Sequence, residues 1–413
     1  MPKVNSAALE NDLLLRGVWE GLGTPECHIT GGYVRDRLLG RKSVDLDLVL
    51  PGDIEAVAGP ARRLAARLDT RPHILGRDAN RVWRIECPEI KIELWPLGCL
   101  SPDDDMRRRD FSCNALFWRL PDGPLDDRIG GQKDLERGVI RALSKQNLED
   151  DPVRLVRAPR FLAQLEGFTL DPQTVDWISS LAPAVANAPR ERIGQELLKL
   201  LAAPGAADGL RSLLELGLFE PAAPAAARCD RDWIENNLSA AARLCGSASH
   251  PVATSVQAGG NAPRLALIFR AWGCPDADSV APFAWSRSER RHAARAAALL
   301  DHTLTTVAAP AADRRAFIHT AGMAFPAALA LAAAIEPNRN WPRWWRLWRE
   351  RGQELVSPDP LLTSEEIASI LKIEPGPELG RTIDALTEAQ VRGEVRTVTG
   401  ARRWLGAWST GSG

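Results

Sequence analysis

The first third of the chain alternates between short apolar strands and amphipathic helices. Alternate positions in residues 44–50 are apolar, which predicts a strand with one polar face and one apolar face. Further strands are expected over residues 27–30, 81–86 and 90–95, and helices over 33–39 and 54–68. The acidic run 103–105 is expected to form a loop. Strands that alternate with helices predict a mixed α/β domain.

From about Leu148 onward, strand patterns give way to leucine and alanine at helical spacing. Leu197, Leu200 and Leu201 are typical of the apolar face of a helix, and Thr363 with Glu366 forms a capping-box sequence. Breaks in these patterns divide the chain into four predicted domains. They are an α/β domain at 1–143 and helical domains at 144–225, 226–357 and 358–413.

The charges nearly balance. Lys+Arg number 52 and Asp+Glu 53 in 413 residues, which gives a net charge of -1. This excludes a polycationic nucleic-acid binder of the histone type. Arginine greatly outnumbers lysine, and a GC-rich genome explains that bias. A role for individual arginines in binding phosphate must therefore be argued one site at a time.

Cysteine usage and hydropathy indicate a soluble protein of the cytoplasm with no membrane partner. The seven cysteines are scattered without a CxxC pair, so neither a disulfide framework nor a zinc site is expected. Residues 1–15 lack the apolar core of a signal peptide. The longest uncharged apolar stretch, 321–335, contains Pro326 and is shorter than the roughly 20 residues that span a bilayer. It is expected to be a buried helix.

Asp45 and Asp47 form the strongest candidate chemical feature. On a strand they share one face with Cα atoms about 6.5 Å apart, so the two carboxylates can bind one or two divalent cations. Alone this DxD pattern is weak, because exposed strand faces often carry acids. Upstream, Gly31 and Gly32 lie at a strand-to-helix junction where backbone amides can approach a phosphate, and Arg35 adds a positive charge. Together they predict a site for a triphosphate and a metal.

Four segments, in order, resemble the motifs of the class II tRNA nucleotidyltransferase and bacterial poly(A) polymerase family. They are Gly31–Gly40 with Val44–Val49, Arg108–Leu116, Leu125–Arg141 and Asp150–Phe161. The resemblance implies an α/β (α+β) polymerase-β-like nucleotidyltransferase head, or palm, at 1–143. All-α neck, body and tail domains would follow at 144–225, 226–357 and 358–413, with the neck carrying the nucleotide-recognition motif.

The resemblance also implies an activity, which is the template-independent addition of C and/or A residues from CTP and ATP to the 3′ end of tRNA. Mg²⁺ would be the cofactor, bound by Asp45 and Asp47, which would activate the terminal 3′-hydroxyl. The triphosphate and sugar would be bound by Gly31, Gly32, Arg35, Arg109, Asp110 and Asn114. The incoming base would be read by Asp151 and Arg154, supported by Arg157 and Arg160. No stable protein partner is evident.

The fourth motif has chemistry that suits base reading. Arg154, Arg157 and Arg160 step by three along a predicted helix, and a carboxylate beside a guanidinium offers the acceptors and donors of a pairing edge. The alternative is that Asp151 caps the helix, Pro152 occupies its first turn, and Asp151 with Arg154 is a surface ion pair. Pro159 is expected to kink the helix that carries Arg160.

Glu93 lies on the predicted strand 90–95, which should neighbour the strand of Asp45. A third acid there suits a catalytic metal site, and the alternative is a solvent-facing residue or a salt bridge. Only residues 98–106 separate this strand from the second motif, where family members that add the full CCA carry a longer flexible loop. The resemblance therefore makes addition of CC alone an open possibility.

Other functions remain open at this point. A poly(A) polymerase shares the same motifs, a catalytically silent RNA-binding protein would not need Asp45 and Asp47, and a small-molecule nucleotidyltransferase would not need the fourth motif. The tryptophans of 341–349 are expected to form an apolar stripe in the core rather than to stack on bases. Residues 372–380 are expected to form a Pro/Gly turn into a helix, and the histidines to be structural.

Overall fold

The computed structural model describes residues 4–23, 26–76, 81–225, 227–245, 260–274 and 276–410. The chain divides into two compact units, one of Met1–Ala188 with Glu215–Pro221 and the other of Pro189–Leu214 with Ala222–Gly413. The finer division into four domains stays a prediction.

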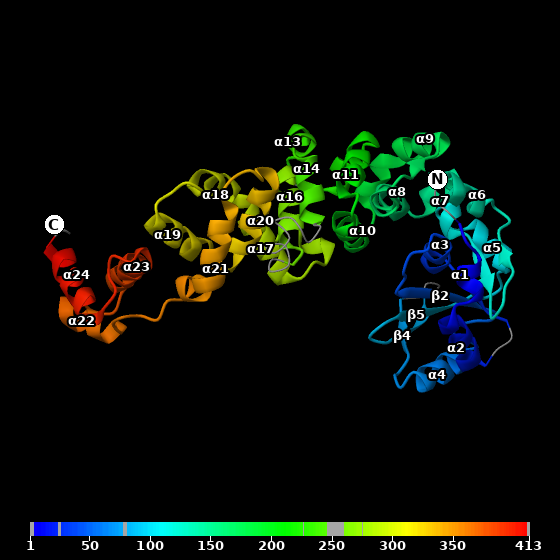
Figure 1. Ribbon diagram of the computed structural model, residues 1–413, viewed down its shortest axis with the longest axis horizontal. Coiled ribbons are helices and arrows are strands. Elements are labelled where there is room, and N and C mark those ends of the chain that lie inside the picture. The colour runs from blue at the N-terminus through cyan, green and yellow to red at the C-terminus, as the bar shows by residue number, and fades with distance from the viewer. Residues whose placement is uncertain are drawn as a thin grey trace. The chain divides into compact units, whose positions relative to one another are not determined.

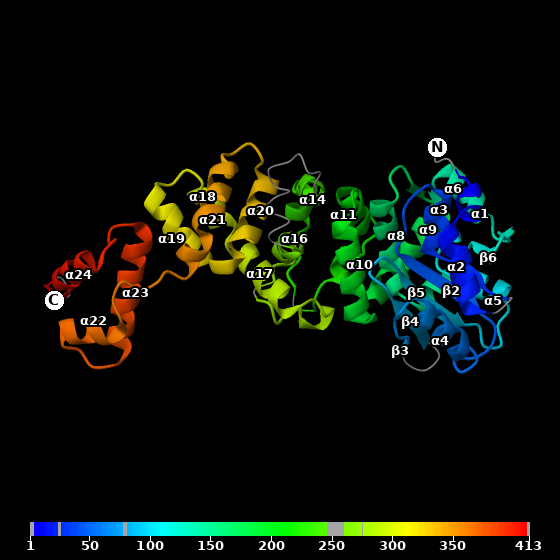
Figure 2. The same ribbon diagram turned by 60° about the horizontal axis from the view of Figure 1, so that its bottom comes forward.

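The first unit is built on a mixed sheet of seven strands among the described residues, in the order β3-β4-β5-β2-β1-β6-β7. Figures 1 and 2 show β4, β5 and β2 side by side. Strand β2 pairs in parallel with β5 and antiparallel with β1, so both neighbours bring side chains next to its two aspartates. The strands are β1 (His28–Thr30), β2 (Asp45–Leu50), β3 (His73–Leu75), β4 (Val82–Glu86), β5 (Lys91–Pro96), β6 (Phe117–Arg119) and β7 (Leu125–Asp126).

Helices complete the first unit, and two of its segments differ from the sequence-based expectation. The acidic run 103–105 is helical rather than a loop, because Ser101 caps the helix α5 and forms a reciprocal capping box with Asp104. The helix expected over 54–68 begins only at Ala58, since Asp53 accepts hydrogen bonds from the backbone of a preceding turn. The helices up to the end of the sheet region are α1 (Ala7–Glu10), α2 (Leu13–Leu22), α3 (Gly32–Leu38), α4 (Ala58–Arg67), α5 (Pro102–Arg107), η2 (Ser112–Asn114) and α6 (Gly131–Arg137).

The rest of the first unit is mainly helical but keeps one small ladder, in which β8 (Val139–Ile140) pairs in parallel with β9 (Thr169–Leu170). Strand β9 was not expected this late in the chain, because two residues are too few for a periodic pattern. Helix α8 continues through Pro159, so Arg160 stays on the same helix as Arg154. The helices are α7 (Lys145–Asp150), α8 (Val153–Gln164), α9 (Pro172–Leu181) and η3 (Ala182–Asn187).

The second unit is helical in its described residues. Its buried centre includes residues 325–334 of α20, and Trp341, Trp344 and Trp345 of α21 are buried as the apolar stripe predicted. Trp348 of the same stripe is half-buried and lies against Phe325. Its helices are α10 (Arg190–Ala202), α11 (Ala206–Glu215), α13 (Arg231–Asn236), α14 (Leu238–Cys245), α16 (Ala262–Trp272), η4 (Ala281–Phe283), α17 (Arg287–Ala298), α18 (Leu300–Thr306), α19 (Ala311–Ala321), η5 (Gly322–Ala324), α20 (Phe325–Ile335), α21 (Trp341–Val356), α22 (Ser364–Leu371), α23 (Pro377–Arg392) and α24 (Val398–Thr410). The short helix α12 (Phe219–Ala222) belongs to the first unit except for its last residue.

One stretch, Ala311–Ile335, is long and apolar enough by length and composition to cross a membrane. Its most apolar part is 72% buried inside the protein, and it consists of α19, η5 and α20 in succession. Burial against protein rather than exposure to lipid is the behaviour of core helices in a soluble protein.

Candidate active site

Three acidic side chains lie on adjacent strands of the sheet. Leu46 and Leu48 of β2 point into the core, which leaves Asp45 and Asp47 together on the opposite face. Glu93 on β5 is the direct register partner of Asp47. The expectation that the strand of Glu93 neighbours that of Asp45 is therefore confirmed.

Asp47 is the electrostatic centre of this face. Burial raises the pKa of its carboxyl to about 6, and the nearby charges of Glu93 and Asp45 add to the rise while Arg109 opposes it. Gly31 precedes α3 with φ of 71°, and a Cβ atom at that position would lie 2.9 Å from Asp47 Oδ2. Glycine at this junction therefore lets the backbone approach the carboxylate closely.

The negative charges of Asp45, Asp47 and Glu93 repel one another, and a bound divalent cation would relieve that repulsion. Among the described residues no three His, Cys, Asp or Glu side chains converge as a ready-made metal cluster. Mg²⁺ is commonly held by one or two carboxylates together with substrate phosphates and water. The paired carboxylates of Asp45 and Asp47 fit that mode of binding, and a cation would favour the ionised form of Asp47, whose pKa is raised.

Glu93 also has a second neighbour, Arg84 of β4. The Arg84 guanidinium donates to Glu93 Oε1 through both Nε and Nη2, and the two residues are register partners across β4 and β5. Both alternatives considered for Glu93 therefore have support, since it lies next to Asp47 and also forms a salt bridge with Arg84. A role of Glu93 as a metal ligand stays a prediction.

A hydrogen-bonded network connects three of the four sequence motifs. Arg35 Nη1 donates to Asn114 Oδ1 at 2.7 Å, and Asn114 Nδ2 donates to Asp110 Oδ1 at 3.1 Å. Asp110 in turn pairs with Arg157 at 3.0 Å. Burial alone would raise the pKa of Asp110, but Arg157 and the hydrogen bond from Asn114 outweigh it and hold the pKa below its usual range. The network therefore stays charged while it joins α3 to η2 and α8.

Arg109 comes close to the acidic face from another side. It pairs with Asp105 at 2.7 Å, and its guanidinium lies over the Phe117 ring at 5.1 Å. Its Nη1 atom would be 3.5 Å from a Cβ at position 31. Of the residues predicted to bind phosphate and sugar, Gly31 and Arg109 thus lie next to Asp47.

In the fourth motif, the start of helix α8 lies one residue away from where the capping alternative placed it. Pro152 is the N-cap of α8 and no side chain caps that end, whereas Asp151 is the C-cap of α7. The alternative placed Asp151 at the cap of α8, whereas that position falls on Pro152, one residue later. Its other element, an ion pair of Asp151 with Arg154, is present. Asp151 Oδ2 lies 3.7 Å from Arg154 Nε, and Arg154 Nη1 donates to the Asn147 backbone carbonyl at 3.0 Å.

Sequence reasoning missed four residues that hold this site together. Asp36 pairs with Arg35 at 2.9 Å and Arg84 holds Glu93. Asn147 Nδ2 donates to the backbone carbonyls of Arg107 and Arg109, which fixes α7 against the second motif. The fourth is the buried Phe161. Asp36 and Phe161 lie inside the motifs, so their positions were visible, but Arg84 and Asn147 carry no such signal.

The charge of Asp47 is expected to lower the stability of the metal-free protein. Because the folded-state pKa is raised from 3.8 to about 6, folding loses free energy as the pH rises through this window. Asp47→Asn should therefore stabilise the protein at pH 7.5 by up to about 3 kcal/mol in chelator, and the gain should fall to about half at pH 5. Urea unfolding at both pH values measures it. A variant that is less stable than wild type at pH 7.5 would contradict the assigned environment.

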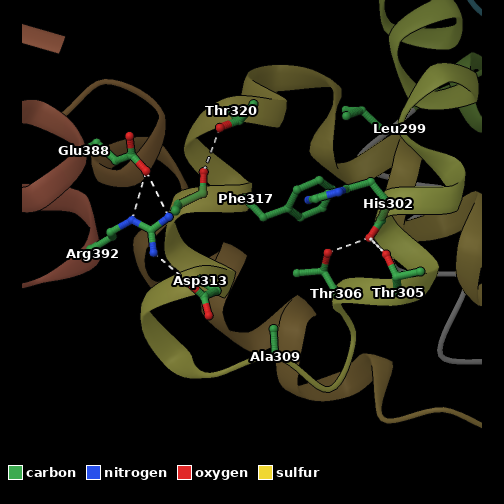
Figure 3. Close-up of a pocket in the computed structure, with 11 residues that line it drawn as sticks. Leu299, His302, Thr305, Thr306, Ala309, Asp313, Phe317, Thr320, Glu388 and Arg392 are labelled. Atoms are coloured by element: carbon green, nitrogen blue, oxygen red, sulfur yellow. Dashed lines mark hydrogen bonds and ion pairs between the residues drawn. The ribbon is translucent and has the colours of Figure 1, made fainter. Parts of the chain in front are cut away.

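The second unit contains a separate cavity of about 720 Å³ lined by α18, α19 and α23. Figure 3 shows His302 against Phe317, with ring centroids 4.9 Å apart, and Arg392 between two carboxylates. Arg392 pairs with Asp313 at 2.6 Å and with Glu388 at 2.9 Å. Both carboxylates of this cavity are thus held by a guanidinium, unlike the paired acids Asp45 and Asp47 of the first unit.

Comparisons with known proteins agree with this geometry. The family model described as "Poly A polymerase head domain" matches residues 27–141, and "Probable RNA and SrmB- binding site of polymerase A" matches residues 167–229. An A-adding tRNA nucleotidyltransferase of Deinococcus radiodurans is 31% identical over 93% of this chain and 96% of its own. A CC-adding tRNA nucleotidyltransferase of Thermus thermophilus is 30% identical over 92% and 93%. The fold is that of the CCA-adding enzyme of Bacillus stearothermophilus in complex with CTP, with a TM-score of 0.74, 22% identity and coverage of 98% of both chains.

Proposed function

The chain belongs to the family of tRNA nucleotidyltransferases and poly(A) polymerases, and we propose that it adds C or A residues from CTP or ATP to the 3′ end of tRNA in the cytoplasm. The observation that carries the proposal is the pair Asp45 and Asp47 on one face of β2, next to Gly31 and Arg109. Such a face can bind the metal, the triphosphate and the terminal hydroxyl together.

Asp45 and Asp47 are the proposed ligands of Mg²⁺, with Glu93 beside them. Bound there, the cation would polarise the reacting phosphate and lower the pKa of the 3′-hydroxyl. The chain's own side chains do the rest, since cationic and amide groups near the pair can hold the phosphates and sugar in place. Those groups are Gly31, Gly32, Arg35, Arg109 and Asn114, with Arg157 and Arg160 in support. The Asp110 carboxylate would accept a hydrogen bond from the sugar.

Base selection is assigned to Asp151 and Arg154. A carboxylate accepts hydrogen bonds and a guanidinium donates them, so the pair can match the edge of an incoming base without a nucleic-acid template. Their separation of 3.7 Å leaves the two groups near enough to act on one base. The hydrogen bond from Arg154 to the Asn147 carbonyl supports a fixed direction for the guanidinium.

The number of nucleotides added is the finer part of the proposal. The segment 98–106 is short and contains the capped helix α5, whose Asp105 holds Arg109, so a long flexible loop has no place there. We therefore favour addition of CC alone. Addition of the terminal A alone is the second candidate, because the relative of 31% identity is named an A-adding enzyme.

Transfer to tRNAs that end before CCA, after C and after CC separates these activities. Each is incubated with Mg²⁺ and one labelled nucleotide at a time. A CC-adding enzyme labels the first two with CTP and none with ATP, whereas an A-adding enzyme labels only the third, with ATP. Long tails of A on any RNA would indicate a poly(A) polymerase, and no labelling of any tRNA would refute the proposal.

A further inference from the structure

Three arginines of the candidate site surround the ring of Phe161. The guanidinium carbons lie 5.1 Å from the ring centroid for Arg35, 5.6 Å for Arg157 and 3.8 Å for Arg160. Phe161 is only 1% exposed, and Phe111 packs edge-on against it at 5.6 Å. Arg35 comes from α3 and the other two from α8, so one aromatic ring joins cations from the first and the fourth motif.

Three guanidinium groups so close together need stabilisation beyond the ion pairs of Arg35 with Asp36 and of Arg157 with Asp110. Arg35 and Arg160 are themselves 6% and 7% exposed, and like charges held together out of water repel one another. A further carboxylate at Arg160 would relieve the remaining repulsion but would also compete with a phosphate for the same donors. The face of an aromatic ring attracts cations through its quadrupole and leaves their full charge available.

Each of the three arginines also has a polar partner besides the Phe161 ring. Arg35 pairs with Asp36 and Arg157 with Asp110, while Arg160 Nη1 donates to the neutral Gln164 side chain at 2.6 Å. These contacts fix the outer side of the guanidinium groups. The ring of Phe161 lies against all three guanidinium groups.

We propose that Phe161 is a positioning residue for nucleotide binding, because its ring holds Arg35, Arg157 and Arg160 in a cluster that receives the phosphates of the incoming nucleotide. The inference rests on the proposed function for the identity of the ligand as a nucleoside triphosphate. Phe161 itself does not touch the reacting atoms, and it acts through the three guanidinium groups.

The test replaces the ring without changing the apolar volume greatly. Phe161→Leu is expected to raise both the KM for CTP and the dissociation constant of CTP, measured by calorimetry without tRNA, by roughly 10-fold. The kcat at saturating CTP should change by less than about 3-fold, because an interaction equal in the ground state and the transition state affects mainly KM. Phe161→Tyr keeps the ring and should restore nearly normal CTP binding.

Two controls separate positioning from packing. Phe168→Leu removes the same ring from another buried position of the first unit and should leave CTP binding unchanged. Fluorination of the Phe161 ring keeps its shape but weakens its attraction for cations, so CTP affinity should fall stepwise from one to three fluorines. If Phe161→Leu does not fold, the fluorinated series alone tests whether the Phe161 ring supports CTP binding.

Unchanged CTP affinity across the fluorinated series would overturn the proposal, as would equal losses for Phe161→Leu and Phe168→Leu. The outcome is distinct from a failure of the proposed function. If wild type binds CTP but transfers nothing to tRNA, the binding measurements still decide the role of Phe161.

Discussion

Asp45→Ala is expected to abolish nucleotide transfer, with a loss of at least about 10³-fold in the single-turnover rate. Asp45 and Asp47 are the two carboxylates on the polar face of β2, and removal of one takes away a ligand of the proposed metal site. Charge stabilisation by a bound cation is worth several kcal/mol, and each 1.4 kcal/mol is about tenfold in rate. The measurement is the rate of transfer from labelled CTP to tRNA at saturating enzyme.

Asp122→Ala is the matched control for this variant. Asp122 is an exposed aspartate of the same unit, paired with Arg16 on the surface, and its loss should leave the rate within about twofold because such pairs contribute little. Retention of more than a tenth of the wild-type rate by Asp45→Ala would show that this carboxylate is not part of the reaction.

Asp151→Ala is expected to change which nucleotide is used rather than to stop transfer. The variant loses the acceptors proposed to face the base but keeps Asp45, Asp47 and the arginines proposed to bind phosphate. Loss of a base-reading hydrogen bond costs about 1–3 kcal/mol, so the ratio of kcat/KM for CTP over ATP should move by roughly 10- to 100-fold. Steady-state rates with each of the four nucleotides measure this ratio.

Asp150→Ala supplies the comparison for base selection. Asp150 precedes Asp151 but accepts a hydrogen bond from Gln146 within α7, so its replacement should leave the nucleotide ratio unchanged. An equal loss of activity with every nucleotide in Asp151→Ala would contradict the assignment, because a template residue must act on one base more than on another.

The sequence predicted the acidic face of β2 well because its signal is local. Alternation of aspartate and leucine fixes which side chains share a face, and burial of Leu46 and Leu48 follows from the same pattern. The neighbouring strand of Glu93 was also predicted, and its register with Asp47 is observed. A period of two residues is enough for both inferences.

The parts that the sequence did not predict depend on contacts between distant segments or on the details of a turn. Helix α5 was missed because three adjacent aspartates suggested a loop, although Ser101 had the right spacing to cap a helix. The cap of α8 was misplaced by one residue because Pro152 fits more than one position in a helix start. The cluster around Phe161 joins two motifs far apart in the chain, and no local pattern reveals such a contact.

Near neutrality of the whole chain is compatible with a site that binds anions. The net charge of -1 is an average over acidic and basic side chains that lie in different places. Arg35 and Arg157 gather around Phe161 in the first unit, while Asp45 and Asp47 lie on β2. Local distribution rather than total charge therefore decides what this surface can bind.

The most direct test of the account is transfer of labelled CMP from CTP to tRNA that ends before CCA, compared with an unstructured RNA of equal length. The account predicts extension of the tRNA by two residues in the presence of Mg²⁺, no extension with Asp45→Ala, and little or none of the unstructured RNA. Failure to extend tRNA ending at any of the three positions, with any nucleotide, would contradict the central claim.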